Sequence, residues 1–182
     1  MLFNTVSRSL HDVGLAAWFG GTLANAVALN PAAAQAGSPS ATGAVANAGW
    51  DRWTPVNAAA IGAHLIGSVG QLLDNTDRLA AQQGVATMSM VKTGVTAAAL
   101  AATGYSRMLG RKISQHHAVP ASDGTTPAAS TPPELATAQK QLAALQWAIP
   151  ALTGALVVIS AFAGEQQRPG NVLSGITRRL AG

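Results

Sequence analysis

The chain has 182 residues, of which 48% are hydrophobic and 10% are charged. Soluble domains usually carry about 25% charged residues, so little charge is present to solvate a soluble surface, although an Ala-rich soluble bundle remains an alternative. The lack of cysteine excludes disulfides and cysteine-based metal or iron–sulfur sites. The net charge of +4 comes from scattered Lys and Arg without a basic stripe, so we expect no nucleic-acid partner.

Four stretches are apolar enough and long enough to cross a bilayer, whose hydrocarbon core of about 30 Å needs roughly 20 helical residues. They are residues 13–29, 55–73, 85–105 and 142–164. Water cannot satisfy the backbone inside lipid, so each stretch must be helical. The sequence therefore predicts an all-α fold, a transmembrane four-helix bundle that forms a single integral membrane domain over residues 1–182. The expected surroundings are a lipid bilayer, with the chain as a multi-pass protein of a bacterial plasma membrane.

The first stretch also has features of a cleavable signal peptide. Arg8 precedes the apolar run, and Ala34-Gln35-Ala36 imitates the cleavage site of such a peptide. However, Asp12 lies at the head of the run and Gly20 interrupts it, whereas a signal core is usually rich in Leu. We expect a membrane span here, and cleavage of residues 1–36 is the alternative.

Proline marks the expected start of the second helix. Thr54 and Pro55 supply an N-cap and a first-turn proline. Residues 31–49 contain Pro39 and many small residues, so they are expected to form a loop that carries a short helix near residues 44–48.

The fourth helix is expected to start at a capping box, with Thr131 as the N-cap and Glu134 as its reciprocal partner. Before it, residues 114–130 consist mainly of Ser, Thr, Ala, Pro and Gly, a composition that cannot bury a core. We expect a long flexible loop between the third and fourth helices.

Four spans place the chain ends and residues 74–84 on one side of the membrane, here named face A. Residues 30–54 and 106–141 lie on the other side, face B. Aromatic residues gather near face B, as in the belts at membrane–water boundaries. These residues are Trp50, Trp53, Tyr105 and Trp147.

Ionisable residues within the spans form a candidate intramembrane polar cluster. Its members are His11, Asp12, His64 and Lys92. An unpaired ammonium in lipid costs about 2.5–3.5 kcal/mol on insertion scales, so Lys92 is expected within reach of Asp12 or of the Asp74/Asp77 end of the second helix. The cluster is either a proton or ion access site or a set of helix-end charges that fix helix positions.

His64 is the most central ionisable group and is expected to make a hydrogen bond between helices. A haem held by two histidines is not expected, because His11 lies about ten residues, or roughly 15 Å, from the middle of its helix. His116 and His117 fall in the loop. We therefore expect no cofactor and no metal site.

Small residues recur at helical spacing on the second and third helices. They are Ala59, Ala63 and Gly67, then Gly94, Ala98 and Ala102. Such stripes allow close backbone approach in lipid, so they predict a tightly packed bundle, with self-association or a membrane-protein partner as a further use.

No catalytic motif is present: the sequence lacks the nucleophile-elbow, phosphate-loop and zinc-helix patterns. We therefore expect a non-enzymatic membrane protein that acts as a scaffold or as an accessory subunit of a membrane complex. The alternative is a small transporter or a proton- or ion-conducting protein that uses Asp12, Lys92 and His64.

The segment Leu10-His11-Asp12-Val13-Gly14-Leu15-Ala16-Ala17-Trp18-Phe19-Gly20-Gly21 resembles the opening of copper-resistance D type bacterial membrane domains and of related four-helix domains of unknown function. His11, Trp18, Gly20 and Gly21 are the corresponding positions. The whole chain is similar to uncharacterised, Ala-rich actinobacterial membrane proteins. The resemblance implies a four-helix membrane protein. Copper handling does not follow, since Met88 and Met90 are the only close methionine pair.

Overall fold

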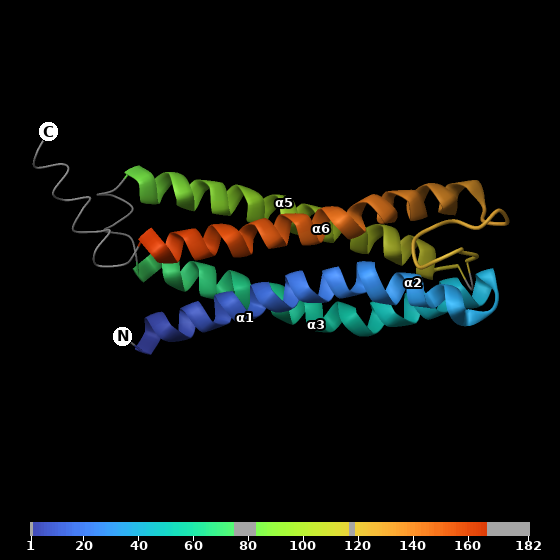
Figure 1. Cartoon of the computed structure of the whole chain (residues 1–182), viewed down its shortest axis with the longest axis horizontal. Helices are drawn as coiled ribbons and strands as arrows, with labels where there is room; N and C mark the ends of the chain where they lie inside the picture. The colour runs from blue at the N-terminus through green and yellow to red at the C-terminus, as the bar shows by residue number, and fades with distance from the viewer. Residues whose placement is uncertain (1, 75–82, 117–118, 167–182) are drawn as a thin grey trace, which may run out of the picture.

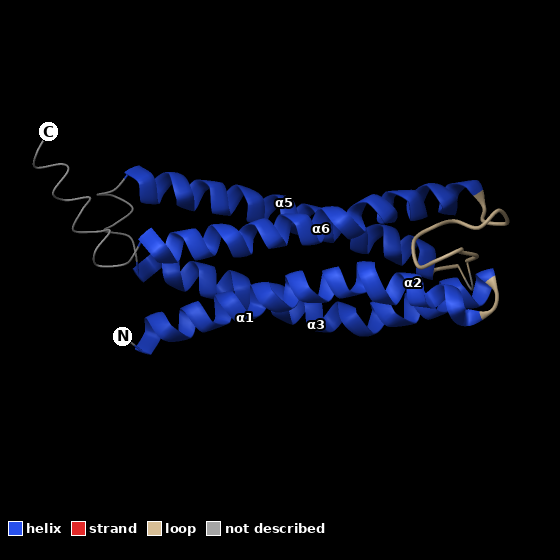
Figure 2. Cartoon of the chain, in the orientation of Figure 1, coloured by secondary structure: helices blue, strands red, loops and turns tan. Residues whose placement is uncertain are grey.

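The computed structural model describes residues 2–74, 83–116 and 119–166, which form long helices (Figures 1 and 2). The elements are α1 (Leu2–Ala24), the π-helical turn η1 (Asn25–Leu29), α2 (Asn30–Ala33), the 3₁₀ turn η2 (Ala34–Ala36), α3 (Pro39–Asp74), α5 (Gln83–Ser114) and α6 (Pro133–Gln166). The described residues contain no strand, and a single bridge pairs Ala121 with Pro127. The all-α prediction is confirmed.

The helices run antiparallel and side by side (Figure 1). Helix α3 has 36 residues, which at 1.5 Å per residue corresponds to about 54 Å, longer than a bilayer core requires. Close packing joins α1 to α3, α5 to α6, and α1 to α6. The start of α1 and the end of α3 share one end of the bundle, as predicted for face A, and η2 and the loop after α5 lie at the face-B end.

Three helical segments are long enough and apolar enough to cross a membrane: Asn4–Ala36, Pro39–Asp74 and Pro133–Gly164. They contain three of the four predicted spans. The predicted span 85–105 lies in α5, which is helical but is not among the three. The membrane crossing of α5 therefore stays a prediction.

Helix α3 begins 16 residues earlier than the predicted start at Pro55. Gly37 adopts a left-handed φ of 84°, which turns the chain after η2. The Ser38 hydroxyl then accepts a hydrogen bond from the amide of Ala41 at 3.2 Å and caps the new helix. Thr54 does not act as a cap, because its hydroxyl donates to the carbonyl of Trp50 at 2.8 Å within the helix. The prediction of a loop over residues 31–49 is wrong for this reason.

The predicted capping box of α6 is also absent. Thr131 is held by the loop instead: its hydroxyl donates to the carbonyl of Pro120 at 2.6 Å and accepts from the amide of Ala128 at 2.9 Å. The carbonyl of Pro132 receives the amides of Leu135 and Ala136. Helix α6 therefore begins at Pro133 with the backbone alone closing its first turn.

The described part of the loop between α5 and α6 is packed against the bundle. Val119 and Ala121 are buried. The amide of Ala121 donates to the carbonyl of Pro39, and the amide of Gly124 donates to the carbonyl of Asn30. The expectation of a flexible loop did not include these contacts, which small side chains and backbone groups make without a hydrophobic pattern.

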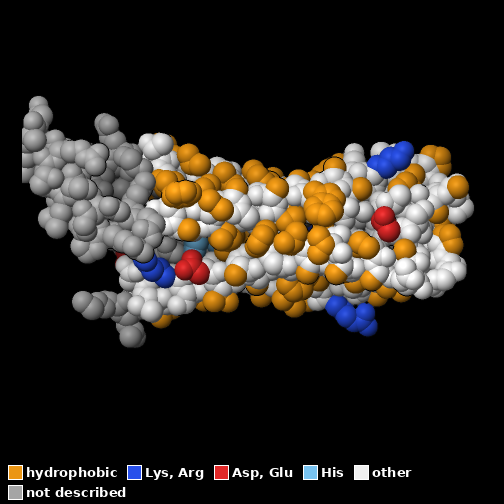
Figure 3. All heavy atoms as spheres, viewed as in Figure 1, with side chains coloured by type: hydrophobic (Ala, Val, Ile, Leu, Met, Phe, Trp, Pro, Cys, Tyr) orange, Lys and Arg blue, Asp and Glu red, His pale blue; other side chains and the backbone are white. Residues whose placement is uncertain are grey.

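Large apolar side chains are exposed along the helices and are spread over the face shown in Figure 3. Exposed examples are Val13, Val27, Val56, Ile66, Val69, Met108, Trp147, Val158 and Phe162. The interior contains apolar side chains and also many polar ones, among them His11, Thr22, Asn30, His64, Gln139 and Thr153. Large exposed apolar patches are rare on soluble proteins.

Candidate functional site

Two glycines bring the backbones of α1 and α3 together. A Cβ atom at Gly14 would meet the backbone of His64, and a Cβ atom at Gly67 would meet the backbone of His11. Each glycine thus provides the space beside one histidine. The small-residue prediction included Gly67 but missed Gly14, which forms the other half of the same crossing.

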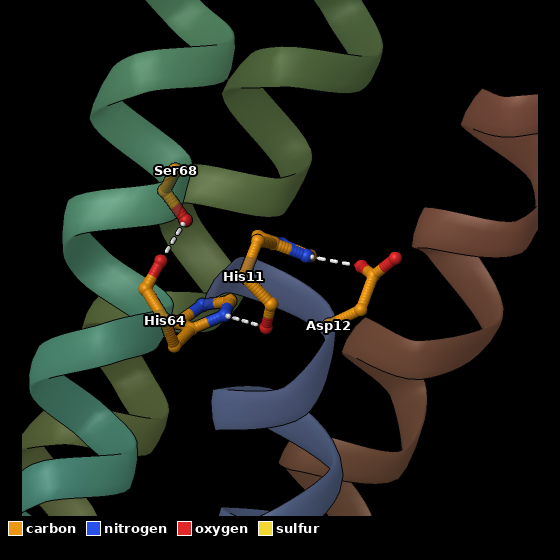
Figure 4. A network of polar contacts seen from close by, with 4 residues as sticks. All are labelled: His11, Asp12, His64 and Ser68. Carbon is orange, nitrogen blue, oxygen red and sulfur yellow. Dashed lines mark hydrogen bonds and ion pairs between the residues drawn. The ribbon is translucent and has the colours of Figure 1, made fainter. Parts of the chain in front are cut away.

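His11 and His64 face each other at this crossing (Figure 4). Their ring centroids are 4.5 Å apart with an interplanar angle of 46°. His11 is 1% exposed and His64 is fully buried. The ring of Trp18 lies 6.1 Å from the ring of His64 on the side toward the middle of the bundle. The predicted cluster therefore has a buried imidazole pair at its centre.

The two histidines use the same ring nitrogen for their contacts. Nδ1 of His11 donates to a carboxylate oxygen of Asp12 at 2.6 Å, and Nδ1 of His64 lies 3.4 Å from the backbone carbonyl of His11. Since a carboxylate and a carbonyl can only accept, both Nδ1 atoms carry a proton. The Nε2 atoms of the neutral rings are then bare acceptors. Both are buried without a hydrogen-bond partner among the described residues.

Asp12 and Lys92 place charge at the edge of the histidine pair. The Asp12 side chain is 70% exposed while it contacts the buried ring of His11. Lys92 is half-buried on α5 and interacts electrostatically with Asp12 and with both histidines. The four predicted cluster residues are thus brought together. Asp74 is exposed at the end of α3, and Asp77 lies outside the described residues.

The prediction that His11 and His64 lie at different depths is wrong. It placed His64 near the middle of a helix that starts at Pro55, whereas α3 begins at Pro39, so His64 lies in the face-A half of α3 and beside His11. The conclusion about haem does not change, because two rings in contact leave no room for a macrocycle between them. The described residues contain no group of three or more His, Asp or Glu side chains that could hold a metal ion. His116 is exposed, and His117 lies outside the described residues.

A cavity of about 320 Å³ occupies the face-B half of the bundle between α3 and α5. We name it the α3–α5 cavity. Helices α3 and α5 are not among the closely packed pairs, which leaves this space open. An apolar cluster separates it from the histidines: Trp18, Ala60, Ala99 and Ile149 are buried together, and Ile61 and Leu100 pack against them and line the cavity.

Asn30 was not recognised from the sequence. It is 1% exposed, its amide donates to Gln146 on α6 at 2.8 Å, and its amide oxygen accepts from the indole of Trp50 on α3 at 3.0 Å. The residue precedes Pro31, and Asn-Pro usually marks a turn. Here the π-helical turn η1 precedes it, and the chain remains helical through Pro31.

Comparisons with protein-family models, with curated proteins and with solved structures found no match to this chain. The resemblance to copper-resistance D type domains is therefore untested. Of its four positions, His11 and Trp18 are buried at the histidine crossing, and Gly21 lies against the ring of Trp53 on α3. At Gly20, a Cβ atom would meet no other heavy atom within 4 Å.

Proposed function

We propose that this chain is a multi-pass protein of a bacterial plasma membrane that moves protons or small ions, with His11 and His64 as the groups that carry charge. The large apolar side chains exposed along the helices support the membrane part of this proposal, because lipid favours an apolar exterior. In this arrangement α5 is the fourth span, and its Lys92 lies near Asp12, which lowers the cost of a cation in lipid.

One observation carries the transport proposal: two adjacent buried imidazoles each have a bare Nε2, and one of them contacts an exposed carboxylate. Ionisable residues inside membrane segments commonly mark proton and ion paths. Asp12 is exposed at face A and accepts a hydrogen bond from His11. His11 is in ring contact with His64, but no hydrogen bond joins the two rings, so transfer of a proton between them requires a turn of one ring or a bridging water.

The path is interrupted beyond His64. The buried cluster of Trp18, Ala60, Ala99 and Ile149 closes the route to the α3–α5 cavity. In the proposed cycle this arrangement is the state that is open to protons from face A and closed between the histidines and the cavity. Transport requires a second arrangement of this cluster that opens the route. In alternating access, such an arrangement forms when one helix pair moves against another.

Flux into reconstituted vesicles tests the proposal. With an inward proton gradient imposed, vesicles that contain the protein and a pH-sensitive dye are expected to acidify faster than empty vesicles, and His64→Gln should lower this rate by at least about tenfold. His116→Gln is the matched control, because His116 is exposed and outside the cluster. Asp12→Asn changes an exposed side chain and should also lower the rate without disturbing packing. Equal rates for empty and loaded vesicles, or for His64→Gln and the unmodified protein, would contradict the proposal.

A specific feature of α5 favours the second function, association as a scaffold or accessory subunit. The outward residues Gly94, Ala98 and Ala101 are small and exposed, and nothing packs on Gly94 within 4 Å. Small exposed residues allow a second copy of the helix to approach closely in lipid. Native mass measurement of the mildly solubilised protein should give a dimer, and Gly94→Leu should give a monomer. A monomer in both cases would remove this candidate.

A further inference from the structure

The α3–α5 cavity is lined by polar atoms that have no partner within the described part of the chain. Five of its side chains each have such a buried nitrogen or oxygen: Trp53, Asn57, Thr103, Arg107 and Gln139. Buried polar groups are normally paired, since each unpaired group costs about 1–3 kcal/mol. Water or a bound molecule in the cavity must therefore supply their partners.

The unpaired atoms include two N–H donors, on Trp53 and Arg107, and two amide oxygens that can only accept, on Asn57 and Gln139, while the Thr103 hydroxyl can do either. A head group beside Arg107 must therefore bring acceptor oxygens, and water must donate to the two amide oxygens. Arg107 also has a positive charge, which its contact with Asp51 at 3.3 Å offsets only in part, because Arg111 and Lys112 lie beside Arg107 along the same surface of α5. The local charge favours an anionic group.

The remainder of the wall is apolar. Ile61, Leu100 and Ile149 line the inner end of the cavity, where they pack at the apolar cluster of the bundle. Asp51 and Gly104 line it too and are exposed, so the cavity reaches the outer surface between α3 and α5. A molecule in it would have its apolar end toward the middle of the bundle and its polar end near Arg107.

We propose that the α3–α5 cavity binds a single-chain amphiphile with an anionic head, which enters from the lipid between the two helices. The volume of about 320 Å³ lies at the lower end of the range of small-molecule sites, and it excludes a two-chain phospholipid. The site does not depend on the histidine pair, so it stands or fails independently of the proposed transport.

Binding can be followed through the tryptophan at the inner end of the cavity. Ile61 and Leu100 line this end and pack against the cluster that contains Trp18, so the terminal bromine of a bound chain would lie near that indole. The exposed Trp147 is replaced by Phe to remove quenching from bulk lipid. ω-Bromododecanoate, whose bromine quenches indole fluorescence on contact, is titrated into this variant in lipid nanodiscs. Quenching is expected to saturate. Quenching that rises without saturation would show partition into lipid only and would overturn the site.

Gly104 is exposed and lines the cavity, and no other heavy atom lies within 4 Å of its Cβ position, so Gly104→Leu adds a side chain at the mouth of the cavity. We expect this variant to bind ω-bromododecanoate more weakly, with a half-saturation concentration raised by about tenfold or more. Gly20→Leu is the matched control on α1, also with open space and outside the cavity, and should leave binding unchanged. Equal effects of the two variants would contradict a site in this cavity.

The head group is tested with the uncharged ω-bromododecanol. Arg107→Gln should weaken binding of the carboxylate until it equals that of the alcohol. Asp51→Asn should strengthen binding of the carboxylate, because the charge of Arg107 is then no longer offset by Asp51. If the alcohol binds as tightly as the carboxylate to the unmodified cavity, the anionic part of the proposal is wrong.

Discussion

Gly14 is the residue on which the histidine crossing depends most directly. Any side chain there would overlap the backbone of α3 at His64, so Gly14→Ala must push α1 and α3 apart. We expect a loss of about 1–3 kcal/mol, the usual cost of overpacking, measured as reversible unfolding in mixed micelles. Gly20→Ala on the same helix meets nothing within 4 Å and should be neutral or stabilising by up to about 1 kcal/mol. Equal losses in the two variants would show that α1 does not cross α3 at Gly14.

Asn30 is the second residue with a large expected effect. Asn30→Ala leaves the indole of Trp50 and the amide of Gln146 without partners, at about 1–3 kcal/mol for a buried group. Adding Trp50→Phe removes one orphaned donor, so the double variant should be less destabilised than the sum of the two single ones, by about 0.5 kcal/mol or more. Additive losses would contradict the hydrogen bond between Asn30 and Trp50.

At this scale the sequence predicts which residues matter better than where they lie. Ionisable groups in apolar segments are rare enough that His11, Asp12, His64 and Lys92 could be chosen by type alone. The contact between His11 and His64 was not predicted, because it depends on the start of α3 at Pro39 and on the register at Gly14. The cavity was not expected, because the small-residue stripes predicted a tightly packed bundle and because its wall comes from side chains far apart in the chain.

Among the elements, the loop between α5 and α6 departs most from its composition. Asp123 organises it: one carboxylate oxygen accepts the amides of Thr125 and Thr126 at 2.7 and 2.8 Å. Burial raises the pKa of Asp123, but these hydrogen bonds and those from the threonine hydroxyls outweigh it, and the pKa is lowered below its ordinary value of 3.8. Asp123 therefore stabilises the loop fully when the pH is above the pKa of Asp123 in the unfolded chain. This stabilisation is lost as the pH falls through the lower pKa of Asp123 in the folded protein.

Hydrogen exchange over residues 119–131 tests this account of the loop. Asp123→Ala should speed exchange of the amides of Thr125 and Thr126, in line with a loss of roughly 1 kcal/mol. Ser122→Ala removes an exposed hydroxyl with a 3.4 Å contact and should have little effect. In the unmodified protein, protection corrected for intrinsic rates should hold at neutral pH and fall only below about pH 3.8. Fast exchange at neutral pH in the unmodified protein would contradict an ordered loop and support the prediction of a flexible one.

Helix boundaries were the features least predictable from the sequence, for a consistent reason. Thr54 and Thr131 look like N-caps, but a Thr hydroxyl can equally donate to a carbonyl four residues earlier or in a loop. Both take that option. Gly37, Ser38 and Pro39 form the actual break, with Gly after the last helical turn, Ser as the N-cap and Pro in the first turn of α3. This local signal was interpreted as part of a loop. Helix type and the positions of three apolar segments followed from composition and were confirmed.

At the scale of the whole molecule, we propose a four-helix bundle that crosses a membrane and keeps many polar side chains in its interior. Three helices are apolar enough by themselves. The crossing of α5 is proposed because Lys92 interacts with Asp12 and because residues 99–113 of α5 pack on α6. If α5 did not cross the membrane, the loop after α5 and the end of α3 would lie on the same side of it.

The chain lacks cysteine, so single cysteines report topology without background. Exposed positions are available at both ends of the bundle: Ser9 and Asp74 at face A, Ser40 and Ser130 at face B. An impermeant maleimide added to sealed cells should label the cysteine variants of one pair only, and the other pair should react only after lysis. Labelling of Asp74→Cys and Ser130→Cys from the same side would show that α5 does not cross. Labelling of all four variants in sealed cells would contradict the membrane-spanning bundle itself.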